Sequence, residues 1–100
     1  MESRERRTIL VVDDELVIRE VLEDFLSTEG YDVVSVPSGE QALQELEEEH
    51  YDAILSDLMM PQMNGLELMA EINARGYQLV KVIMTGYGTI ETAVQAMKVG

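Results

Sequence analysis

Acidic residues directly follow two short apolar runs of the sequence, and they are its strongest chemical signal. Asp13 and Asp14 come after residues 9–12, and Asp57 comes after residues 53–56. A third apolar run, residues 80–84, is followed by the hydroxyl of Thr85. Carboxylates that lie together repel one another unless a proton or a cation offsets their charge. Mg²⁺ suits such a group, because it takes oxygen ligands and binds through one or two carboxylates plus phosphate oxygens.

The same residue types suit phosphoryl transfer. A carboxylate that is free to attack phosphorus forms an acyl phosphate, which is a form of covalent catalysis. A cation beside it would neutralise charge on the transferring group. Thr85 donates a hydrogen bond without carrying a charge, so it can bind an incoming phosphoryl oxygen. Taken singly, each aspartate is explained equally well as a turn residue. Phosphoryl transfer is favoured over turn formation only if Asp13, Asp14, Asp57 and Thr85 lie together in the fold.

The elements that must position these side chains alternate as in an α/β fold. Apolar runs at 9–12, 53–56 and 80–84, and a more polar run at 31–36, predict parallel strands with 31–36 at an edge. Apolar residues at helical spacing predict a first helix through Ile18, Val21, Leu22, Phe25 and Leu26, and a third through Leu66, Met69 and Ile72. Ser38 with Gln41 and Asn64 with Glu67 indicate helix starts, and Gly30 and Gly76 indicate helix ends. Residues 89–99 predict a further helix.

Right-handed crossovers arrange such strands in the flavodoxin-like, doubly wound order 2-1-3-4. Strands one, three and four are then neighbours. Ligands bind beyond the carboxyl ends of parallel strands, so Asp13, Asp14, Asp57 and Thr85 should converge on one edge of the sheet.

Composition narrows the function further. With 100 residues the chain is expected to form one domain. A net charge of −13 opposes nucleic-acid binding, so we expect no direct contact with DNA or RNA. No apolar run is long enough for a membrane helix, and residues 1–7 do not resemble a secretory signal. The absence of cysteine excludes disulfides and thiolate chemistry. We expect a cytoplasmic protein.

Three stretches of the sequence resemble the receiver domains of bacterial two-component response regulators. They are residues 11–15, 57–65 and 84–88, and the resemblance extends over residues 8–100. It implies that Asp57 is the phosphoacceptor and that Asp14 binds Mg²⁺ directly, for which Mn²⁺ can substitute. Asp13 would assist through water, and Met59 would add its backbone carbonyl.

The resemblance also implies a function and partners. Thr85 would be the switch hydroxyl, which passes the signal into the helix that follows. The domain would accept its phosphoryl group from a sensor histidine kinase and control an output domain or partner protein. It would be a phosphoacceptor that assists its own phosphorylation and dephosphorylation, and not an enzyme. Residues 86–100 look most like receivers of sigma-54-dependent transcription activators.

The sequence departs from this family in one respect. Receivers continue into a fifth strand, which ends in a lysine, and a fifth helix, and both are absent from this chain. Neither Lys81 nor Lys98 takes the place of that lysine. We therefore expect a flexible tail over residues 1–7 and a receiver domain over residues 8–100, truncated after its fourth helix. Because strand 80–84 becomes a bare edge, we also expect self-association.

Two alternatives remain open at this point. One is a pseudo-receiver, an interaction module with the same fold that is not phosphorylated. The other is a metal-dependent phosphatase with an aspartate nucleophile. That class places a second acid two residues after the nucleophile, where this chain has Met59.

Overall fold

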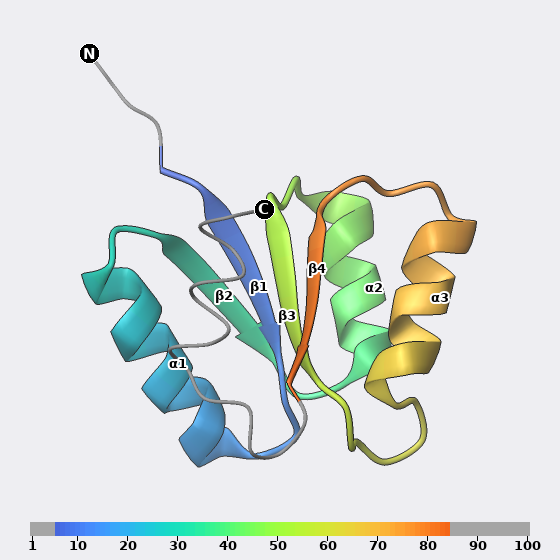
Figure 1. The fold of residues 1–100 in the computed structure, drawn as a ribbon, viewed down its shortest axis with the longest axis horizontal. Helices are drawn as coiled ribbons and strands as arrows, with labels where there is room; N and C mark the ends of the chain where they lie inside the picture. Colours follow the sequence, from blue (N-terminus) through green and yellow to red (C-terminus); the bar gives the residue numbers. More distant parts are fainter. Residues whose placement is uncertain (1–5, 85–100) are drawn as a thin grey trace.

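The computed structural model describes residues 6–84. Strands and helices alternate along this part of the chain (Figure 1). In chain order they are β1 (Thr8–Val12), α1 (Leu16–Thr28), β2 (Asp32–Val36), α2 (Gly39–Glu48), β3 (Ala53–Asp57), α3 (Gly65–Ala74) and β4 (Val80–Met84). Thr85 and the helix expected over 89–99 lie outside the described residues.

The strands form one parallel sheet in the order β2-β1-β3-β4, which confirms the predicted flavodoxin-like arrangement. Among the described strands, β1 and β3 are central, and Ile9 to Val12 and Ala53 to Ser56 are buried throughout. β2 lies at an edge as expected, with burial alternating along the strand. The apolar runs at 9–12 and 53–56 therefore mark the strands that are covered on both faces, whereas β4 is only partly buried.

Helices cover both faces of the sheet, with α1 on one side and α2 and α3 on the other (Figure 1). Because side chains alternate along a strand, β1 sends Leu10 and Val12 toward one face and Ile9 and Val11 toward the other. Two apolar clusters result. The first contains Leu10, Val12, Ile54, Leu68, Met69 and Ile72, and the second contains Ile9, Val11, Leu22, Leu26, Leu55 and Met84.

The helix ends follow the capping signals in the sequence. Gly30 and Gly76 adopt positive φ angles of 99° and 80° after α1 and α3. The Ser38 hydroxyl accepts a hydrogen bond from the Gln41 N–H at the start of α2. A full capping box forms at α3, where Asn64 and Glu67 each accept from the other's backbone N–H.

The side chain of Leu66 lies elsewhere than the sequence predicted. Leu66 is 62% exposed, whereas Leu68 is fully buried. Leu68, Met69 and Ile72 share the face of α3 that packs on the sheet, and a residue two positions before Leu68 falls on another side of the helix. The side chain of Met59, in the loop before α3, is 74% exposed.

Candidate functional site

Three aspartates meet at the carboxyl edge of the sheet. Asp13 and Asp14 follow β1, and Asp57 is the last residue of β3. β1 and β3 are paired with Val12 opposite Ser56, so the next residues along the two strands also face each other. One carboxylate oxygen from each aspartate lies within 4.8 Å of the others. This is the location that the parallel-strand rule predicted.

The three carboxylates differ in exposure: Asp13 is buried, Asp57 is half-buried and Asp14 is exposed. Burial raises the pKa of the Asp13 carboxyl above its usual range, while a hydrogen bond from the Glu15 N–H lowers it. The negative charges of Asp57, Asp14 and Glu15 raise that pKa further. The cluster therefore holds more negative charge than its surroundings offset, which favours cation binding.

The donor set fits Mg²⁺. All the side-chain groups in the cluster are carboxylates, which are hard oxygen donors, and their oxygens are close enough to share one ion. The exposed Asp14 and half-buried Asp57 leave one side of the cluster open to solvent. An ion that keeps several of its waters, as Mg²⁺ does, needs such an opening.

The backbone of Asp13 is fixed by contacts that the sequence did not reveal. Its N–H donates to the Val36 carbonyl at 3.2 Å, which ties the residue to the end of β2. The Arg19 guanidinium donates to the Asp13 carbonyl at 2.7 Å. Arg19 thus brings a cation from α1 beside the aspartates. The only hint in the sequence is that Arg19 lies early in the helix that follows Asp13.

The remaining site residues of the sequence analysis are Met59 and Thr85. Met59 lies two residues after Asp57, and its N–H is 3.4 Å from Asp57 Oδ1. Its side chain is largely exposed, and its main chain lies beside the Asp57 carboxylate. Thr85 follows Met84, which is the β4 partner of Asp57 in the sheet register, and lies outside the described residues.

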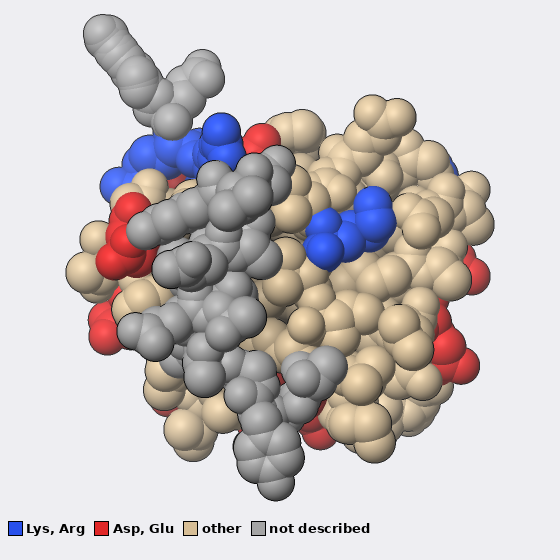
Figure 2. Space-filling model, viewed as in Figure 1, with Lys and Arg blue, Asp and Glu red and all other residues tan. Residues whose placement is uncertain are grey.

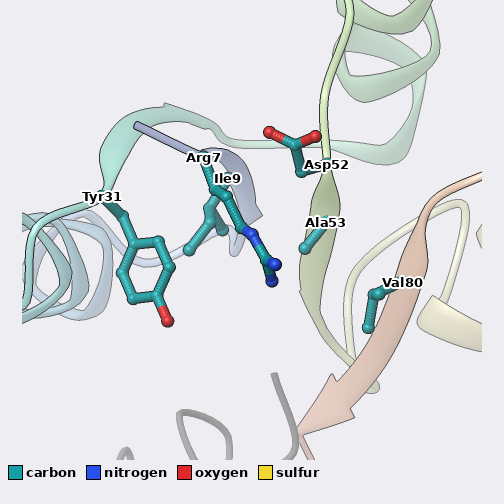
Figure 3. A pocket seen from close by; sticks show the side chains of 6 residues that line it. All are labelled: Arg7, Ile9, Tyr31, Asp52, Ala53 and Val80. Carbon is teal, nitrogen blue, oxygen red and sulfur yellow. The ribbon is translucent and has the colours of Figure 1, made fainter. Parts of the chain in front are cut away.

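A cavity at the opposite end of the sheet is not a competing site. It lies at the amino ends of β1, β3 and β4, and the Arg7 side chain extends into it beside Tyr31 (Figure 3). Its volume of about 20 Å³ is enough for roughly one water molecule. Asp52 joins the strands here: its carboxylate and N–H bind the Thr8 backbone, and its carbonyl accepts from Val80.

The fold and the acidic cluster together are typical of a class of signalling domains, and comparison with known proteins identifies the family. The profile of the response regulator receiver domain matches residues 9–100. The chain belongs to this family. None of the helices within residues 6–84 is long and apolar enough to cross a membrane.

Individual relatives agree with this assignment. The chain is 40% identical over 92 residues to the transcriptional regulatory protein ZraR of Escherichia coli K12, a match that covers 92% of this chain and 21% of ZraR. It is 39% identical to the response regulator protein FleR of Pseudomonas aeruginosa, with 92% and 20% covered. The chain therefore spans about a fifth of the length of these relatives. The predicted resemblance to sigma-54-dependent activators is confirmed.

A solved structure shows a similar protein with a partner. A chain of the crystal structure of the histidine kinase ThkA in complex with the response regulator protein TrrA is 37% identical to this chain. The TM-score is 0.76, and the match covers 83% of this chain and 72% of the other.

Proposed function

We propose that this chain is the phosphoacceptor domain of a two-component system, in which Asp57 receives a phosphoryl group from a sensor histidine kinase. One observation carries the proposal. In a chain of the receiver family, the carboxylates of Asp13, Asp14 and Asp57 lie within 4.8 Å of one another at the carboxyl edge of the sheet.

The transfer is a displacement at phosphorus. An oxygen of the Asp57 carboxylate forms the new bond to phosphorus, while the phosphorus–nitrogen bond of the donor phosphohistidine breaks. The imidazole nitrogen leaves with the electron pair of that bond. Asp57 is suited to this role because it is half-buried, which leaves its carboxylate accessible to the donor.

Asp13 and Asp14 would hold Mg²⁺ together with Asp57 and the Met59 backbone carbonyl, and Mn²⁺ would substitute. When bound, the ion neutralises charge on the phosphoryl oxygens. The domain is then a phosphoacceptor that assists its own phosphorylation and dephosphorylation, and it turns over no separate substrate.

The switch belongs to the same proposal. Thr85 would bind a phosphoryl oxygen and shift the segment that continues into residues 89–99. A few kcal/mol are enough to change a two-state balance of this kind. NMR shifts on adding beryllofluoride should extend through this segment. Shifts confined to the neighbours of Asp57 would contradict a switch.

The proposed partners are the kinase and an output domain or partner protein, with transcription regulation as the output, in the cytoplasm. The surface beside the site supports a protein partner. On α1, Leu16, Val17 and Val21 are 57%, 66% and 45% exposed. An apolar surface of this kind, on the helix that begins directly after Asp13 and Asp14, suits a protein donor that must approach the acidic cluster.

Intact-mass measurement after incubation with acetyl phosphate tests the proposal. The wild-type chain should gain one phosphoryl group with Mg²⁺ and none with EDTA. Asp57→Asn should remain unlabelled, while Asp24→Asn, an exposed position on α1, should label like the wild type. Equal labelling of the Asp57→Asn variant would rule out Asp57 as the acceptor. No labelling of the wild type would favour the pseudo-receiver.

A further inference from the structure

The main-chain carbonyl oxygen of Asp57 has two close neighbours, Ser56 and Gly65. The hydroxyl of Ser56, a fully buried residue, donates a hydrogen bond to the carbonyl oxygen at 3.0 Å. The second neighbour is Gly65, the first residue of α3. A Cβ atom added to Gly65 would stand 2.6 Å from the Asp57 oxygen and 3.1 Å from the Leu58 Cα. Real Cβ atoms essentially never approach so closely, so only glycine permits this contact between helix and strand.

Gly65 also closes the loop that joins β3 to α3. Its N–H donates to the Leu58 carbonyl at 2.9 Å, and the Leu58 N–H donates to the Met84 carbonyl at 2.9 Å. Leu58 is thus fixed to α3 and to β4 at the same time. Asp57 precedes Leu58 and Met59 follows it. Asp57 and Met59 both belong to the proposed site. They therefore flank a residue, Leu58, whose position Gly65 helps to fix.

The loop reaches this arrangement through a strained turn. Gln62 has a φ angle of 71°, which is uncommon for a residue other than glycine. The Met63 N–H donates to the Pro61 carbonyl at 2.7 Å across it. A hydrogen bond between residues two apart, around a central positive φ, is the rarer and more strained form of γ-turn. Such strain persists where the surrounding structure demands it, and it gathers at functional sites.

We propose that Gly65 is a positioning residue of the phosphoacceptor site, and that Ser56 supports the same Asp57 carbonyl through its hydrogen bond. Because Gly65 lets α3 pack directly on this carbonyl, it sets the position of the Asp57 carboxylate and the Met59 main chain. Both positions are set relative to Asp13 and Asp14, which follow β1. The inference rests on the proposed function, since it concerns the same cation-binding residues.

Mn²⁺ binding to the 100-residue chain tests this role without a phosphorylation assay. The ion is titrated, and its free fraction is followed by electron paramagnetic resonance. Circular dichroism establishes a temperature at which each variant is folded. Gly65→Ala should bind Mn²⁺ about tenfold more weakly, as is usual when a group that orients metal ligands is lost. Ser56→Ala, which removes the hydrogen bond without adding volume, should also bind more weakly.

Gly76→Ala is the matched control. Gly76 lies after the other end of α3, with a φ angle of 80° and no atom within 4 Å of an added Cβ. This variant should lose stability and keep wild-type affinity. Wild-type affinity in folded Gly65→Ala overturns the inference. If Gly65→Ala does not fold, the Mn²⁺ affinity of Ser56→Ala decides instead, and wild-type affinity in that variant overturns the inference. A wild-type chain that binds no Mn²⁺ overturns the proposed function as well.

Discussion

The carboxylates of Asp13 and Asp57 face each other across the ends of two paired strands, and their charges act on each other. Burial raises the pKa of Asp13, and the charge of Asp57 raises it further. The metal-free site therefore holds a buried carboxylate whose ionised form is disfavoured. At Asp13, cation binding favours the ionised carboxylate, whereas the stability of the metal-free fold favours the neutral carboxyl.

Replacing Asp13 by asparagine should stabilise the metal-free domain at neutral pH. The folded state holds the Asp13 proton more tightly than the unfolded chain, whose carboxyl has an ordinary pKa of 3.8. Stability is therefore lost as pH rises from that value through the raised one. Asparagine keeps an acceptor for the Glu15 N–H and removes the charge. Thermal melts in EDTA should show a higher midpoint at pH 7, and the gain should shrink toward pH 4. Asp24→Asn should show no comparable gain.

Mg²⁺ should stabilise the wild-type domain against heat. At an ion concentration ten times the dissociation constant, a ligand that binds only the folded state adds about 1.4 kcal/mol. Melts with and without Mg²⁺ measure the shift, and NaCl at matched ionic strength controls for screening of the net charge of −13. Asp57→Asn should reduce the shift. An equal shift in Asp57→Asn would place the ion elsewhere.

Two leucines of α3 should differ sharply in their contribution to stability. Leu68 is fully buried, so Leu68→Ala should cost about 2–5 kcal/mol. Leu66 is 62% exposed, so Leu66→Ala should change the free energy of unfolding by no more than about 0.5 kcal/mol. Urea unfolding of the pair measures both. A similar loss in the two variants would contradict the orientation of α3.

In a polypeptide that retains the fifth strand of the family, the phosphoryl group on Asp57 should be long-lived, because no polar side chain at position 59 orients an attacking water. Met59→Asn should shorten the lifetime of the acyl phosphate, and a polar residue in place of Tyr87, which lies outside the described residues, should shorten it further. Mass spectrometry over a time course measures the loss. Leu66→Asn is the control, since Leu66 is also an exposed apolar residue. An unchanged lifetime in Met59→Asn would reject the idea.

The 100-residue chain should self-associate through β4. Within the described residues, β4 pairs only with β3, and its other edge presents free backbone groups. Figure 2 shows a largely uncharged surface beside β4, with a basic patch on it and acidic groups at the margins. Light scattering over a dilution series should show dimers or larger species. A polypeptide extended past Gly100 is the comparison. A monomer at all concentrations would contradict this expectation.

Much of the site was predictable because parallel strands impose a simple geometry. Apolar runs identified β1, β3 and β4, and the rule for their carboxyl ends brought Asp13, Asp14 and Asp57 together without any knowledge of side-chain positions. A glycine permits two backbone segments to approach closely, and at Gly65 the start of α3 does approach the end of β3 in this way. The identities of the atoms it approaches came only from the structure.

Other features depend on tertiary contacts that a single sequence does not encode locally. Leu66 and Leu68 are the same residue type, so composition cannot say which one faces the sheet. Arg19 reaches a backbone carbonyl, which is present at every residue and leaves no signal. Gln62 has no intrinsic preference for a positive φ; the loop imposes it.

The two ends of the sheet have separate tasks, with carboxylates at one and the Asp52 hydrogen bonds at the other. This separation offers a place for a label. His50 lies beside Asp52, and its side chain is 81% exposed. Because the sequence has no cysteine, His50→Cys would create a single reactive thiol. A dye or a surface linker attached there would leave the acidic end of the molecule facing solution, available to a kinase in single-molecule or immobilised-binding measurements.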